Sequence, residues 1–162
     1  MNFLSIVFAL FVIFNTIQLE ANDESILAGQ RAEPVTGQTA MVVTSHHLAT
    51  EVALNILKAG GNAIDAAVAA GFALAVTQPR SGNIGGGGFM LYSPNNTDAV
   101  TAIDYREKAP SSAYENMFLD DKGNVDQSLS RFSHLSAGVP GTVAGFTLAI
   151  EKFGTMSLAE VL

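Results

Sequence analysis

The segment IDYREKAP, residues 103–110, places an arginine and a glutamate directly after a run of apolar residues. An arginine near a core is costly unless its planar fork of N–H donors is satisfied, and a carboxylate matches that fork with two parallel hydrogen bonds. Arg106 therefore indicates either a site for a carboxylate-bearing ligand or an internal salt bridge to one of the acidic residues. Glu107 is the next residue along the chain, whichever of these two roles Arg106 has.

Four consecutive glycines, Gly85–Gly88, raise the question of a phosphate-binding loop. A dinucleotide fingerprint starting at Gly85 needs glycine where the chain has Met90, and a P-loop starting at Gly82 needs lysine where it has Gly88. Both loops also follow a strand and open a helix, whereas this run follows a helical pattern and opens a strand. We interpret the run as backbone that passes so close to another element that no Cβ fits.

Motifs for metals and nucleophiles are absent or incomplete. The adjacent His46 and His47 point apart on a helix and have no histidine four residues on, so we expect surface residues near a helix start. Residues 120–126 resemble a calcium loop only by composition, because Lys122 and Val125 break the order and spacing of oxygen ligands that such a loop requires. Cysteine, a G-x-S-x-G elbow and an S-x-x-K motif are all absent. We therefore expect no metal, no cofactor and no catalytic nucleophile within these residues.

The composition is that of a globular chain. Of the 162 residues, 48% are hydrophobic and 14% are charged, which excludes a disordered polymer. The formal net charge of −7 argues against a nucleic-acid partner, because such a partner requires a basic face.

Apolar periodicity predicts the elements that position these residues. We expect a strand at 40–44, a helix capped by Ser45 and ending at Gly60, a helix capped by Asn62 and ending before Pro79, strands at 89–93 and 100–105 joined by a turn at 95–98, a short helix at 113–118, a polar surface loop at 120–130, a turn at 136–141 and a helix at 142–153.

Two of these elements predict deep burial. Residues 66–76 are apolar or glycine without exception, which is typical of a buried helix that its neighbours approach closely. In the strand at 100–105 both faces are fairly apolar, which predicts a strand covered on both sides.

The N-terminus is distinct from the rest. Phe3–Phe14 is almost wholly apolar, shorter than the roughly 20 residues that span a bilayer, and of a length that fits a secretory signal. Leu19 and Ala21 occupy the −3 and −1 positions for cleavage before Asn22. We expect a signal peptide at 1–21, a periplasmic or secreted protein and no stable membrane span; the alternative is an uncleaved N-terminal anchor.

A capping-box pattern, Ser157 with Glu160, predicts a helix start close to the last residue. A single helical turn is not stable alone, so we interpret the chain as the N-terminal piece of a longer protein. It would comprise a polar lead-in at 22–38 and an incomplete domain at 39–162. The alternative is a non-catalytic secreted binding module that ends here.

Six segments in order carry a family resemblance: ILKAGGNAIDAAVAAGFALAVTQP, SGNIGGGGFML, AIDYREKAP, MFLDDKGN, GVPGTVAGF and FGTMSLAEV. On these segments, from about Arg31 to Leu162, the chain resembles the gamma-glutamyltransferases, also called gamma-glutamyltranspeptidases or glutathione hydrolases, and the bacterial ones most closely.

The resemblance implies an N-terminal-nucleophile hydrolase of the α+β class, folded as a four-layer αββα sandwich. Such a precursor cuts itself into a large and a small subunit, and the new N-terminal threonine of the small subunit is the nucleophile. It forms a gamma-glutamyl-enzyme, which passes the group to water or to an amino acid or peptide. Implied substrates are glutathione and other gamma-glutamyl compounds. The threonine lies beyond residue 162, so the chain alone is expected to be inactive.

The resemblance also implies roles for two residues. The arginine of the motif D-[FY]-R-E-x-A-P, here Arg106, binds the α-carboxylate of the gamma-glutamyl group, and Glu107 supports it. The rest of the pocket lies beyond this chain, and the glycine run is structural. The alternative within the superfamily is an acylase, such as a cephalosporin acylase, or a poly-gamma-glutamate enzyme; the retained arginine favours a gamma-glutamyl donor.

Overall fold

The computed structural model describes residues 35–81, 83–95 and 97–162. The predicted signal peptide and most of the polar lead-in lie outside the described residues. Residues 37–162 form one unit, and the elements below belong to it. None of the helices in the described ranges has the length and apolar character that a bilayer crossing requires.

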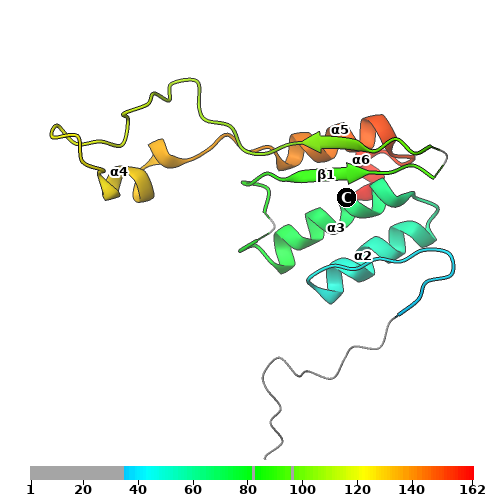
Figure 1. Cartoon of the computed structure of the whole chain (residues 1–162). Helices are drawn as coiled ribbons and strands as arrows, with labels where there is room; N and C mark the ends of the chain where they lie inside the picture. Colours follow the sequence, from blue (N-terminus) through cyan, green and yellow to red (C-terminus); the bar gives the residue numbers. More distant parts are fainter. Residues whose placement is uncertain (1–34, 82, 96) are drawn as a thin grey trace, which may run out of the picture. The chain divides into compact units, whose positions relative to one another are not determined.

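This unit contains helices and one small antiparallel sheet (Figure 1). In chain order they are α2 (His47–Lys58), α3 (Ala63–Thr77), β1 (Phe89–Tyr92), β2 (Thr101–Asp104), α4 (Gln127–Phe132), the 3-10 helix η1 (His134–Ser136), α5 (Thr142–Phe153) and α6 (Leu158–Val161).

The junction between α2 and α3 follows the chemistry of helix ends. Gly60 takes a positive φ of 97°, a conformation that favours glycine after a helix. The side chain of Asn62 then accepts the backbone N–H groups of Ile64 and Asp65, and the Asp65 carboxylate returns to the N–H of Asn62. This capping box confirms the predicted start of the second helix.

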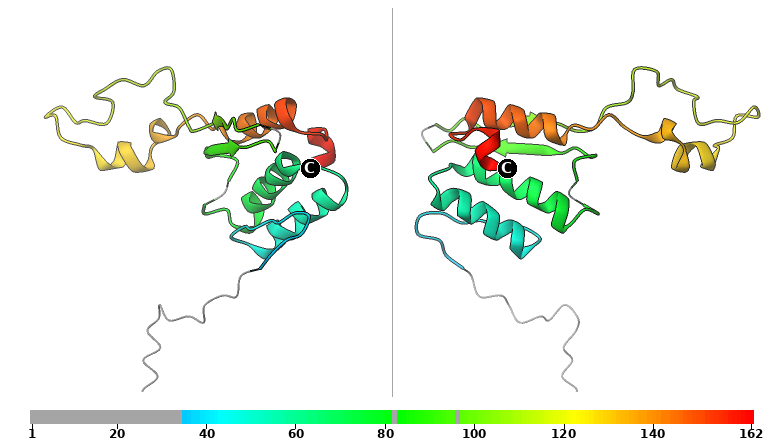
Figure 2. Two further views of the ribbon diagram at one scale, coloured as in Figure 1. Left: turned by 45° about the vertical axis from the view of Figure 1, so that its right-hand side comes forward. Right: turned by 180° about the vertical axis from the view of Figure 1, so that it is seen from behind.

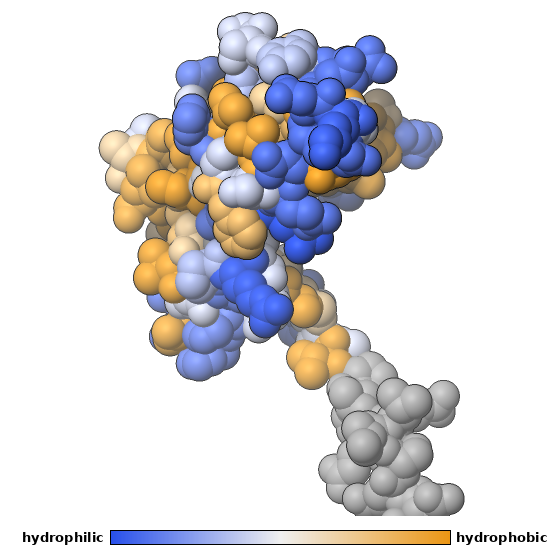
Figure 3. All heavy atoms as spheres, turned by 90° about the vertical axis from the view of Figure 1, so that its left-hand side faces the viewer, coloured by the Kyte–Doolittle hydropathy of each residue, from blue (hydrophilic) through white to orange (hydrophobic). Residues whose placement is uncertain are grey.

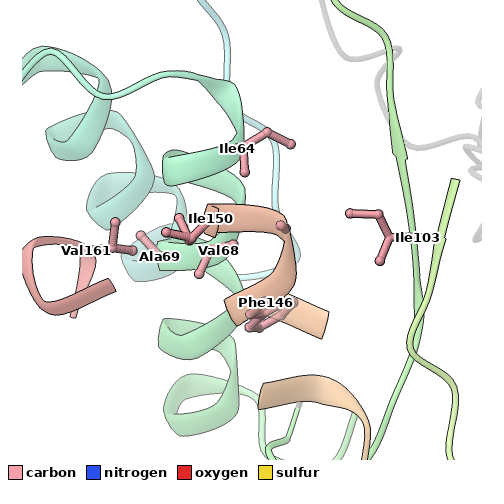
Figure 4. Packing of buried hydrophobic residues seen from close by; sticks show 8 residues of the cluster. Ile64, Val68, Ala69, Ile103, Phe146, Ile150 and Val161 are labelled. Atoms are coloured by element: carbon pink, nitrogen blue, oxygen red, sulfur yellow. The ribbon is translucent and has the colours of Figure 1, made fainter. Parts of the chain in front are cut away.

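Helix α3 is the central element of the unit. It contacts α2, α5 and α6. Figure 2 shows it between α2 on one side and the two strands with α5 on the other. β1 and β2 pair antiparallel, with Phe89 opposite Asp104 and Tyr92 opposite Thr101. The main buried cluster joins α3, β2, α5 and α6 (Figure 4) and consists of Ile64, Val68, Ala69, Ile103, Phe146, Ala149, Ile150 and Val161.

Close approach to α3 is confirmed at one glycine. A Cβ on Gly71 would collide with the ring of Phe146 on α5.

Burial of α3 is less complete than predicted, because the buried residues lie in its first half, up to Ala70. Val76, near the end of α3, is 81% exposed. Figure 3 shows that hydrophobic side chains are exposed among hydrophilic ones on one face of the molecule.

Several predicted elements are wrong in detail. Residues 40–44 form no strand, because a strand requires a hydrogen-bonded neighbour and this segment has none among the described residues. His46, not Ser45, caps α2. Residues 113–118 form turns rather than a helix.

The polar segment before α5 and the second strand also differ from expectation. The loop predicted for 120–130 includes the start of α4, whose N-cap, Asp126, accepts the N–H groups of Ser128 and Leu129. In β2 only Ile103 is buried, so the strand is covered on one face in this unit.

Candidate functional site

The predicted site residues follow β2 directly, where the backbone is held at several points. Tyr105 extends the ladder, because its N–H donates to the carbonyl of Gly88 at 3.0 Å. The Asp104 carboxylate accepts the N–H of Arg106 at 3.0 Å. Lys108 then exchanges two backbone hydrogen bonds with Val139, at 3.2 and 2.8 Å. Arg106 thus lies on a short segment whose two ends are fixed.

The glycine run packs against this segment. A Cβ on Gly87 would lie 2.6 Å from the carbonyl oxygen of Tyr105 and 2.7 Å from the backbone nitrogen of Glu107. Real Cβ atoms are not found so close to backbone atoms. The prediction that no Cβ fits is confirmed at Gly87, whereas a Cβ on Gly85 or Gly86 would come no closer than 3.3 Å to its neighbours.

Helix α5 begins against the same strand end. The carbonyl of Gly86 accepts the N–H of Gly141 at 2.9 Å and that of Thr142 at 3.1 Å. A Cβ on Gly141 would collide with the Tyr105 carbonyl, and one on Gly145 with the Tyr105 side chain. Tyr105 thus packs against these glycines, and its partial burial raises the pKa of its phenol.

Arg106 and Glu107 are both exposed, and they line different hollows. Glu107 lines a cavity of about 950 Å³ together with the glycine run, α3 and residues 39–44. Arg106 lines a hollow of about 280 Å³ with Asp104 and Lys108. Val139, Pro140, Gly141, Ala144, Gly145 and Leu148 form much of its remaining wall. The structure therefore does not bring the two predicted site residues into one hollow.

The alternative role of Arg106 as an internal salt-bridge residue finds no partner in the part of the chain that the structure describes. No carboxylate there lies within 4.0 Å of its guanidinium nitrogens. Its backbone N–H donates to Asp104, and the residue is exposed and lines the hollow. An exposed arginine at a concave surface can bind a carboxylate.

The other candidates from the sequence have local structural roles. His46 Nδ1 accepts the N–H of Leu48 at the start of α2, and its ring stacks on that of His47 at 4.7 Å, so the expectation that they point apart is wrong. Asp120 Oδ1 accepts the N–H groups of Lys122 and Asn124 and shapes a turn. Among residues 35–81, 83–95 and 97–162, no group of three potential metal ligands occurs.

Sequence reasoning missed the second role of Asp65, which is wholly buried. Its carboxylate accepts the hydroxyl of Thr155 at 2.6 Å and the N–H groups of Thr155 and Met156, as well as that of Asn62. Burial opposes the charge, yet these hydrogen bonds hold the pKa of Asp65 below its ordinary value. The partners lie 90 and 91 residues later, so no local pattern could reveal them.

Comparison with known proteins decides the family. The model of the family described as Gamma-glutamyltranspeptidase matches residues 49–162. The chain belongs to this family. The resemblance inferred from the six segments is thereby confirmed, and Arg106 lies within the matched range.

Individual members of the family support this assignment. The chain is 57% identical over 129 residues to the glutathione hydrolase proenzyme of Escherichia coli strain K12, covering 80% of this chain and 22% of that protein. It is similar to the crystal structure of Helicobacter pylori gamma-glutamyltranspeptidase, with a TM-score of 0.75, 50% identity and coverage of 80% and 37% of the two chains.

A more distant neighbour bears on the alternative acylase function. The cephalosporin acylase of Bacillus halodurans matches with a TM-score of 0.61 and 27% identity, over 83% of this chain and 26% of that one. Its identity is about half that of the Helicobacter pylori enzyme. The chain spans about a fifth of the length of the curated relatives that it matches.

Proposed function

We propose that this chain is the N-terminal part of the large subunit of a glutathione hydrolase precursor, which folds with the remaining polypeptide into an αββα sandwich. The observation that carries the proposal is the family match over residues 49–162. The mixed helices and strands of the described unit are compatible with a portion of such a sandwich.

In the proposed reaction, Arg106 binds the α-carboxylate of a gamma-glutamyl donor through its two parallel N–H groups. A threonine at the N-terminus of the small subunit attacks the donor's γ-carbonyl carbon and expels the amine. The resulting ester of the gamma-glutamyl group is then cleaved by water, or by the amino group of an amino acid or peptide acceptor. Glu107 supports the segment from the side of the larger cavity.

Expression of the complete precursor tests this function. We expect it to cleave itself into two subunits and to hydrolyse a chromogenic gamma-glutamyl amide. Residues 22–162 alone are expected to show no turnover, because no nucleophile is identified in them. A processed two-subunit enzyme that leaves gamma-glutamyl amides intact would contradict the proposal.

An acylase function is the second candidate, favoured by the structural likeness to the cephalosporin acylase. The two functions differ in the donor that they require. A gamma-glutamyl enzyme prefers a donor with an α-carboxylate, whereas an acylase for other groups turns over amides that lack one. Comparison of the two donors at equal concentration separates these possibilities. No observation favours a non-catalytic binding module.

We further propose that the protein is exported to the periplasm or the medium. The support is the apolar run Phe3–Phe14 with a cleavage pattern before Asn22. N-terminal sequencing of exported protein should begin near Asn22. An intact Met1 would instead indicate an uncleaved anchor.

A further inference from the structure

A second cation lies beside Arg106. Lys108, two residues later, lines the same hollow of about 280 Å³, whereas the intervening Glu107 lines the larger cavity. The lining of this hollow also includes Ile103, Asp104 and Tyr105, the consecutive residues before Arg106. The backbone at Lys108 is fixed by its two hydrogen bonds to Val139, so the placement of the lysine follows from the fold.

The basic residues at this hollow contrast with the net negative charge of the whole chain. The sequence has 8 basic and 15 acidic residues, yet two of the basic ones stand within three residues of each other here. Asp104 is the acidic residue at the hollow, and its Oδ1 already accepts the N–H of Arg106. Much of the remaining wall is apolar or glycine, as described above. The hollow therefore holds two cations and one carboxylate, and Lys108 is a second cation beside Arg106.

Building on the proposed function, we propose that Lys108 is a specificity-determining residue that binds a second carboxylate on the donor. Glutathione carries such a group on its glycine, in addition to the α-carboxylate assigned to Arg106. Residues two apart in an extended chain are separated by about 6.6 Å, and the flexible stem of lysine extends that reach. A compact ammonium on such a stem suits a carboxylate whose position differs between donors.

Steady-state kinetics of the complete processed enzyme test this role. Two donors are compared: glutathione, and a gamma-glutamyl anilide that has the α-carboxylate only. With Lys108→Gln we expect KM for glutathione to rise roughly two- to fivefold, the range of an exposed ion pair, while KM for the anilide and both kcat values stay unchanged. Lys108→Arg should restore most of the preference. Lys122→Gln, in the remote turn that contains Asp120, is the matched control and should affect neither donor.

The wild-type enzyme supplies a second, independent readout. If Lys108 contributes a charge–charge contact, raising the salt concentration should increase KM more for glutathione than for the anilide, because exposed charges are screened. Equal responses of the two donors to Lys108→Gln, or equal salt dependence if that variant is not processed, would overturn the inference. A wild-type enzyme inactive on both donors would instead refute the proposed function itself. Activity on both donors without a Lys108 effect refutes only this inference.

Discussion

Gly87 and Tyr105 pack so closely that a Cβ on the glycine would lie 2.6 Å from the tyrosine carbonyl oxygen. The same Cβ would lie 2.7 Å from the nitrogen of Glu107 and 2.9 Å from the carbonyl carbon of Arg106. Gly87 therefore limits where the backbone of the Arg106 segment can lie.

Substitution Gly87→Ala is expected to displace the Arg106 segment. Its Cβ meets backbone atoms, which cannot rotate away, so we expect a loss of about 1–3 kcal/mol of stability and a rise in KM for gamma-glutamyl donors. Thermal unfolding and steady-state kinetics of the complete enzyme measure the two effects. Gly85→Ala is the control, because its Cβ would meet only the Asn83 side-chain oxygen, at 3.3 Å. Equal melting temperatures and KM values in both variants would show that the close approach is not required.

The helices could be predicted because their signals are local. Asn62 caps α3 as predicted, and the helix before it ends near Gly60, where φ is positive. Segment 40–44 has the apolar composition of a strand, but a strand depends on a partner that its own sequence does not specify. Helix α4 was missed because its residues are polar and its only strong signal is the cap Asp126.

The site was predictable only in part. The chemistry of Arg106 follows from its residue type and its place after an apolar strand. That Glu107 and Lys108 line different hollows depends on the register of β2 and on the bridge to Val139. Both are tertiary features, as is the link from Asp65 to Thr155. A sequence pattern can indicate the chemistry of a residue, but not which hollow or surface the residue lines in the folded chain.

The buried carboxylate of Asp65 is expected to stabilise the junction between α3 and the turn after α5. Asp65→Asn removes the charge and directs an amide N–H₂ toward N–H and O–H donors. We expect a loss of about 1.5–3 kcal/mol of unfolding free energy, the range for hydrogen bonds to a charged group. Urea unfolding of the complete protein measures it. The exposed Asp121→Asn should change stability by less than about 0.5 kcal/mol, and a similar effect in both variants would contradict the assigned role.

This contribution should depend on pH with a definite sign. Hydrogen bonds hold the folded-state pKa of Asp65 below its ordinary value of 3.8, although burial alone would raise it. The stabilisation is therefore complete above the unfolded pKa and is lost as pH falls through the folded one. We expect the stability gap between wild type and Asp65→Asn to be constant near neutral pH and to shrink below about pH 4. A gap that widens on acidification would exclude this explanation.

The central claim is that Arg106 binds the α-carboxylate of the donor, and the complete enzyme carrying Arg106→Lys tests it most directly. The measurement compares kcat/KM for a gamma-glutamyl anilide with that for the 4-aminobutanoyl anilide, which lacks only the α-carboxylate. Loss of the bidentate contact should lower kcat/KM for the first donor at least about tenfold, mainly through KM, and leave the second unchanged. Self-cleavage into two subunits should persist, as a gel will show, because the precursor's own scissile bond carries no such carboxylate. A processed Arg106→Lys enzyme with unchanged preference for the gamma-glutamyl anilide would contradict the account.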